Sequence, residues 1–116
     1  MTKALALVAL LAVVFAAVPA HATNYLCQGT VNFLGMGNDG TVYVSGPGGI
    51  PIVQLCNINT AASNSIGTEA CKSYYSTLLA VKLSGGQALV YFGDSLTCST
   101  QPAWTIPVSV YFIATT

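Results

Sequence analysis

The stretch TEACKSYYSTLLAVKL, residues Thr68–Leu83, followed by a pair of glycines, decides how the rest of the chain can be organised. Its apolar side chains recur at the i, i+3, i+4 and i+7 spacing of a helix with one buried face. They are Cys71, Tyr74, Tyr75, Leu78, Leu79 and Val81. Thr68 is expected to cap the first turn, where Glu69 is favourable, while Lys82 and Gly85 suit the last turn and a left-handed C-cap. The pattern predicts a single helix that lies on a sheet.

Strand-like runs flank this helix on both sides. Three precede it and two follow it, namely Cys27–Leu34, Thr41–Ser45, Ile50–Cys56, Gln87–Phe92 and Trp104–Ala114. The first and last of these alternate with the period of two that is typical of strands. The resulting order, β-β-β-α-β-β, is that of the small five-stranded OB barrel, in which the helix connects strands three and four. We therefore expect a mainly β, OB-like barrel; an open α+β sheet with the helix on one face is the alternative.

The connecting segments are rich in small and polar residues. Gly35–Gly40 and Gly46–Gly49 lie between strands, which favours hairpin turns. Neither joins a strand to a helix, so a phosphate-binding loop is not expected. Asn57–Gly67 and Asp94–Ala103 are predicted to be surface loops.

Four cysteines can pair in three ways. Cys56 and Cys71 flank the polar loop before the helix, so we predict a disulfide between them, which leaves Cys27 to pair with Cys98. The expected barrel supports this second pair, because the first strand of an OB barrel pairs with the fourth, which brings Cys27 near the chain that leads to Cys98. Four free thiols, or a metal held by four thiolates, are the alternatives. No CxxC pair is present, so a zinc site is not expected.

The N-terminal segment has the pattern of a secretory signal peptide. Lys3 precedes the apolar run Ala4–Val18, and small residues then lead to a cleavage site after Ala22. A membrane anchor is the rival interpretation, but the run is shorter than the roughly 20 residues that a span needs. We therefore predict a signal peptide over residues 1–22 and one secreted or periplasmic domain over residues 23–116.

Charged side chains are scarce in that predicted domain. They are Asp39, Glu69, Asp94, Lys72 and Lys82, with no His or Arg. Without a basic patch, binding to nucleic acid or to anionic membranes is disfavoured. Without an imidazole base, and with each carboxylate in a turn, a helix start or a loop, we expect neither an enzyme nor a cofactor or metal. A near-neutral surface rich in apolar groups tends to associate, which favours an oligomer.

Aromatic residues supply one candidate contact for a ligand. Trp104 follows a polar loop beside Pro102 and is expected to form an exposed platform on which a sugar ring can stack. Tyr74 and Tyr75 lie on the apolar face of the helix and are expected in the core or in a subunit contact.

The segment EACKSYYSTLLAVKLSGGQALVYF, residues 69–92, resembles the matching region of the B subunit of subtilase-type AB5 cytotoxins. That region also has a helix, a short Gly-Gln turn and a strand that ends in aromatic residues. The resemblance covers roughly residues 56–92 and extends more weakly to Gln28-Gly29 in the first strand. It implies an OB barrel, assembly into a homo-oligomeric, pentameric ring, and binding of sialylated glycans.

The resemblance also points to positions that contact the glycan. The family uses a serine early in strand one and a tyrosine at the end of strand four, and Gln28 and Phe92 stand there in this chain. Gln28, Phe92 and Trp104 are therefore the candidate ligand-binding residues. The expected function is that of a secreted, non-catalytic binding module for a glycan or a partner protein. The alternative is a structural or partner-binding envelope or periplasmic protein with no glycan pocket.

Overall fold

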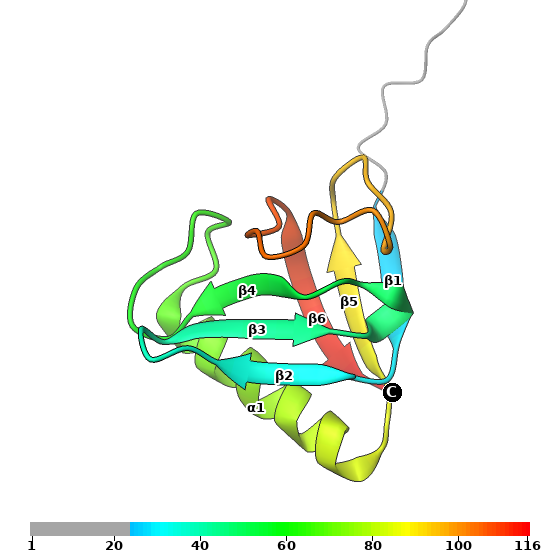
Figure 1. The fold of residues 1–116 in the computed structure, drawn as a ribbon, viewed down its shortest axis with the longest axis horizontal. Coiled ribbons are helices and arrows are strands. Elements are labelled where there is room, and N and C mark those ends of the chain that lie inside the picture. Colours follow the sequence, from blue (N-terminus) through cyan, green and yellow to red (C-terminus); the bar gives the residue numbers. More distant parts are fainter. Residues whose placement is uncertain (1–23) are drawn as a thin grey trace, which may run out of the picture.

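The computed structural model describes residues 24–116, which form six strands, one helix and a short 3₁₀ turn (Figure 1). In chain order these are β1 (Tyr25–Gly29), β2 (Phe33–Met36), β3 (Thr41–Ser45), the 3₁₀ turn (Pro47–Gly49), β4 (Val53–Asn57), α1 (Thr68–Ser84), β5 (Ala88–Phe92) and β6 (Val110–Thr115). The predicted signal peptide lies outside the described residues. Within residues 24–116, no helix is both long enough and apolar enough to cross a membrane.

The strands form two antiparallel sheets of three, with the orders β1-β5-β6 and β2-β3-β4. The strands of the two sheets cross steeply, and α1 runs along one side of them (Figure 1). The core fills the space between these layers and is formed mainly by Val, Leu, Ile, Phe and Cys side chains. The prediction of a mainly β fold with one helix is confirmed. The strand pairing gives two sheets and no closed barrel, so it does not establish the five-stranded barrel.

The predicted first strand, Cys27–Leu34, is not continuous. Residues 30–32 form a corner at which the chain leaves one sheet and enters the other. Lys82 at the end of α1 fixes this corner, because its Nζ donates to the carbonyl oxygen of Asn32 at 2.9 Å. Gly46 packs against the same corner with φ 119°, and a Cβ on it would lie 2.4 Å from the carbonyl oxygen of Thr30. The break therefore depends on contacts from distant parts of the chain.

The predicted last strand, Trp104–Ala114, begins six residues late, at Val110. Its register also contains a bulge, since Phe92 pairs with Val110 while Tyr91 pairs with Phe112. The extra residue, Tyr111, interrupts the period of two predicted for this run: Phe112 is exposed, whereas Ile113 is buried with Val110.

The segment before β6 pairs elsewhere. The N–H of Trp104 donates to the carbonyl oxygen of Ile52 at 2.7 Å, and the N–H of Gln54 donates to the carbonyl oxygen of Thr105 at 2.9 Å. Residues 104 and 105 thus lie along the edge of β4. The predicted strand Ile50–Cys56 is likewise shifted, because β4 begins only at Val53.

The helix lies where the sequence predicts it. Its N-cap is Gly67 and no side chain caps it, so the prediction that Thr68 caps the helix is wrong. Gly85 takes the expected left-handed C-cap conformation, with φ 72°. Cys71, Leu78 and Val81 are buried on its inner face, and both tyrosines of the helix are half-buried.

Both predicted disulfides are confirmed. Cys27–Cys98 ties the loop between β5 and β6 to β1, and Cys56–Cys71 ties β4 to α1, each with a Cα–Cα distance of 5.7 Å. Disulfides persist in oxidising compartments, so the two bridges indicate a non-cytoplasmic protein.

Candidate functional site

The surface with the most distinctive chemistry is the outer face of β3 and β4, formed by Thr41, Tyr43, Gln54 and Asn57. Tyr43 pairs with Gln54 and Thr41 pairs with Asn57 across the two strands. Val42 and Val44, which alternate with Thr41 and Tyr43 in β3, are buried in the core, so alternation turns these four side chains to the other side of the sheet, where Thr41 is largely covered. Leu55 is an extra residue in β4, which makes a bulge beside Gln54.

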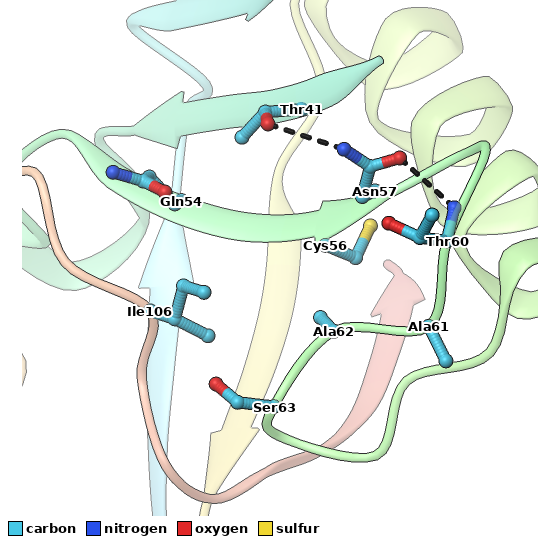
Figure 2. Close-up of a pocket in the computed structure, with 9 residues that line it drawn as sticks. All are labelled: Thr41, Gln54, Cys56, Asn57, Thr60, Ala61, Ala62, Ser63 and Ile106. Atoms are coloured by element: carbon cyan, nitrogen blue, oxygen red, sulfur yellow. Dashed lines mark hydrogen bonds between the residues drawn. The ribbon is translucent and has the colours of Figure 1, made fainter. Parts of the chain in front are cut away.

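A pocket of about 190 Å³ lies at one end of this outer face, under the loop of residues 58–67 (Figure 2). It is lined by Thr41, Gln54, Cys56, Asn57, Thr60, Ala61, Ala62, Ser63 and Ile106. Hydroxyl and amide groups alternate with small apolar ones, and no lining residue is charged. Such a lining can exchange neutral hydrogen bonds with a ligand and cover its apolar parts.

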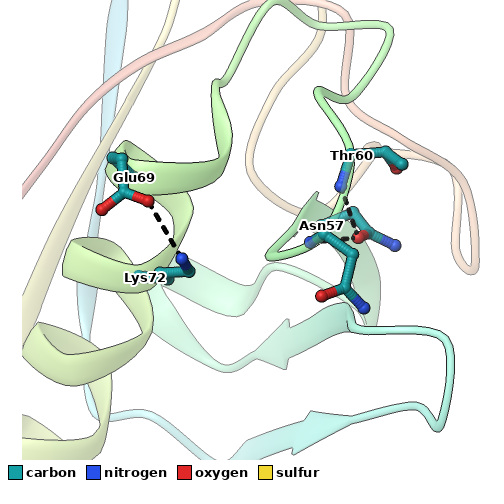
Figure 3. A network of polar contacts seen from close by, with 5 residues as sticks. Asn57, Thr60, Glu69 and Lys72 are labelled. Carbon is teal, nitrogen blue, oxygen red and sulfur yellow. Dashed lines mark hydrogen bonds and ion pairs between the residues drawn. The ribbon is translucent and has the colours of Figure 1, made fainter.

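Asn57 holds the pocket rim in place. Its Oδ1 accepts hydrogen bonds from the N–H groups of Asn59 at 2.8 Å and Thr60 at 3.1 Å, which forms an Asx turn (Figure 3). Its Nδ2 donates to Thr41 Oγ1 at 3.3 Å, as Figure 2 shows. At the other end of the loop, Asn64 Nδ2 donates to the carbonyl oxygen of Leu55 at 2.9 Å. The loop is therefore anchored to β4 at both ends.

Trp104 adjoins the pocket as an exposed aromatic platform. Its side chain is 59% exposed, and its backbone has the left-handed φ of 61°. Gln54 Nε2 donates to its carbonyl oxygen at 2.7 Å, and its ring meets the ring of Tyr43 edge-on, with centroids 5.8 Å apart. Gln54 thus joins the platform to the pocket, since it also lines the pocket.

Asp94 anchors the loop of residues 93–109 that carries Trp104. Its carboxylate accepts hydrogen bonds from Tyr25 Oη at 2.6 Å, Gln101 Nε2 at 2.9 Å and the N–H of Leu96 at 2.9 Å. Burial raises the pKa of Asp94, but these three hydrogen bonds outweigh it and hold the pKa below its usual value. Burial, followed by the bond to Asp94, raises the pKa of Tyr25 to about 12.

The remaining charged groups also have local partners. Asp39 accepts hydrogen bonds from the N–H and hydroxyl of Thr41, both at 3.0 Å, and these bonds lower its pKa. Glu69 and Lys72 form an exposed ion pair at 2.9 Å on the helix surface (Figure 3). No cluster of three or more His, Cys, Asp or Glu side chains that could hold a metal ion is found in residues 24–116.

The three candidate ligand residues do not form one site. Gln28 is exposed on β1, where its Nε2 donates to Gln87 Oε1 at 2.9 Å. Phe92 is only 1% exposed and stacks on Tyr25, so the expectation that it contacts a ligand does not fit its place in the core. Both belong to the β1-β5-β6 sheet, whereas Trp104 borders the other sheet.

The four residues of the outer face, Thr41, Tyr43, Gln54 and Asn57, are absent from the sequence-based candidates, as are the other residues that line the pocket. The alternation of residues 41–45 already turns Tyr43 away from the valines, so a signal for it exists. The sequence Asn57-Ile-Asn-Thr60 is also compatible with an Asx turn. Gln54 has no such signal, because its role depends on its register with Tyr43 and on Trp104 folding back onto β4.

Comparisons with protein families, with curated proteins and with solved structures find no match to this chain. The case for a function therefore depends on the chemistry of the outer face and its pocket.

Proposed function

We propose that this chain is an exported, non-catalytic binding module that binds an uncharged carbohydrate on the outer face of β3 and β4. The observation that carries the proposal is the exposed Trp104 beside a pocket of neutral hydroxyl and amide groups. A sugar ring offers an apolar face that can stack on an aromatic ring and hydroxyls that exchange hydrogen bonds with such groups. The two disulfides support export.

We further propose that the two sheets are parts of one OB-like barrel. Three features support it: the corner at residues 30–32, the pairing of β1 with β5, and the hydrogen bonds that Trp104 and Thr105 make with the edge of β4. In such barrels the second and third strands, with the loop between the fourth and fifth, bind oligosaccharides and oligonucleotides. Here β3 and β4 take those strand positions, and Trp104 lies in that loop.

The homo-oligomer that the resemblance to AB5 B subunits implies, a pentamer, remains part of the proposal, whereas the anionic sialylated ligand does not, because no residue that lines the pocket is charged. The outer face of the β1-β5-β6 sheet supports association. Leu26, Tyr91 and Phe112 pair across its three strands as one uncharged row, and Leu26 and Phe112 are exposed. Native mass spectrometry of the oxidised chain should give one defined oligomer, and a strict monomer would contradict the ring.

The binding proposal is tested with Trp104→Ala on a glycan array, followed by calorimetry with the best neutral sugar. Loss of the stacking ring should weaken binding by about tenfold, which corresponds to about 1.4 kcal/mol. Val108→Ala is the matched control, since Val108 is an exposed apolar residue of the same loop. Equal affinity of wild type and Trp104→Ala would contradict the proposed site.

A structural or partner-binding envelope protein is the second candidate. The row of Leu26, Tyr91 and Phe112 favours it, because Leu26 and Phe112 are exposed and exposed apolar patches often contact other proteins. A folded, disulfide-bonded protein that binds no glycan on the array would favour this second function over the first.

A further inference from the structure

A second exposed aromatic residue lies on the same side of the β2-β3-β4 sheet as Trp104. Phe33 is 44% exposed and begins β2, where it pairs with Ser45. Its neighbour Leu34 pairs with the buried Val44, so Phe33 points to the outer side of the sheet. Its ring lies over Gly35, because a Cβ on Gly35 would be 3.0 Å from two of the ring carbons.

Phe33, Tyr43 and Trp104 form an aromatic row across this sheet. Gly35, which the Phe33 ring covers, pairs directly with Tyr43 on β3. Trp104 is held at the edge of β4 and reaches Tyr43 with a centroid distance of 5.8 Å. Since neighbouring strands lie about 4.8 Å apart, the row extends roughly 10 Å from β2 to β4. That length exceeds what a single sugar ring covers.

The charged residues near the row indicate which class of polymer can bind to it. Single-stranded nucleic acids also stack on aromatic residues, but they need a positively charged groove for their phosphates. No Lys or Arg occurs in β2, β3, β4 or the loop of residues 93–109, and Lys82 of α1 donates its Nζ hydrogen bond to the carbonyl oxygen of Asn32, at the corner before Phe33. The nine residues of the adjoining pocket carry no charge. The surroundings therefore suit an uncharged polymer.

We infer that the aromatic row binds a neutral oligosaccharide of at least two rings, with one ring on Trp104 and Tyr43 and the next on Phe33. This inference rests on the proposed function and extends it from a sugar to a sugar chain. Hydroxyls of the ring on Trp104 reach Gln54 and the pocket. The ring on Phe33 adds affinity only when the ligand is long enough to reach it.

The test is calorimetry with glucose, cellobiose and cellotetraose, and with N-acetylglucosamine, its dimer and its tetramer. Wild type should bind the tetramer of one series at least tenfold tighter than its monomer. Phe33→Ala should remove most of that gain and leave monosaccharide affinity within twofold. Trp104→Ala should weaken the binding of every sugar in both series. Met36→Ala, an exposed residue of the same strand, should change nothing.

Phe33→Tyr keeps an aromatic ring and should keep the gain, which separates stacking from a disturbed fold. Trp104-dependent binding with equal affinity for monomer and tetramer would overturn the extended site and leave the proposed function intact. Retention of the full gain in Phe33→Ala would also overturn it. No binding of any sugar would contradict both the proposed function and this inference.

Discussion

Asp94 links the pH of the solution to the stability of the loop that carries Trp104. Its pKa is lowered from the usual 3.8 in the folded protein, so its stabilising effect is present above pH 3.8 and is lost as pH falls through the folded value. The stabilising effect of Asp39 is lost over the same pH range, because its pKa is lowered too. Both carboxylates therefore make the fold less stable in acid.

We expect Asp94→Asn to lower the free energy of unfolding at pH 7 by about 1 kcal/mol, a value reduced because the site is partly exposed to solvent. The variant should also lose less stability than wild type between pH 4 and pH 2. Urea denaturation at each pH measures both effects. An unchanged acid dependence in Asp94→Asn would assign the effect to Asp39 alone.

Tyr25 should make the fold less stable in alkali, whereas the two carboxylates make it less stable in acid. Its pKa is raised from 10.0 to about 12, so the stability that it contributes is complete below pH 10 and is lost as pH rises through 12. Phe at this position cannot ionise. Tyr25→Phe should therefore be less stable than wild type at pH 8 and lose less stability between pH 10 and pH 12. Denaturation curves at these pH values, with tyrosinate absorbance, provide the check; parallel curves would contradict the assignment.

At the scale of elements, the buried and the exposed face of α1 should contribute differently to the free energy of unfolding. Leu78 is 0% exposed, whereas its neighbour Leu79 is 37% exposed. Leu78→Ala should cost about 2–5 kcal/mol because it leaves a cavity, and Leu79→Ala should cost less than about 1 kcal/mol. Urea denaturation compares the two. Leu78→Asp should not fold, and a folded Leu78→Asp would mean that the helix buries another face.

Elements differed in how far their own residues predict them. The bounds of Thr41–Ser45 and of the helix follow from periodicity, although the helical pattern also placed Leu79 on the buried face and this side chain is exposed. The corner in residues 30–32 does not, since the alternation of residues 27–34 continues across it and only contacts with Lys82 and Gly46 reveal the break. The bulge at Tyr111 is also invisible in sequence, because it depends on the register of β6 against β5.

At the scale of the whole molecule, the neutral outer face predicts binding that is insensitive to salt. Screening weakens interactions between charges, and no charged residue lines the pocket. Affinity for the best neutral sugar should therefore change less than twofold between 50 mM and 500 mM NaCl, an ionic-strength range over which the screening length falls by roughly threefold. Calorimetry at both concentrations tests this. A tenfold loss would contradict this prediction, because it would mean that charged groups contribute to the binding of the sugar.

The sequence by itself determined the helix, the turns, the Cys56–Cys71 pairing and the scarcity of charge, because these depend on residues close in the chain or on composition. The sequence predicted Cys27–Cys98, which spans 71 residues, only as the pair of cysteines left over. It also marked Trp104 as an exposed platform. Only the tertiary structure decided where that platform lies. Trp104 meets Tyr43 and Gln54 through strand register, a bulge and backbone bonds to the edge of β4, all of which join segments distant in sequence. The same long-range packing placed Phe92 in the core and Phe33 on the aromatic row.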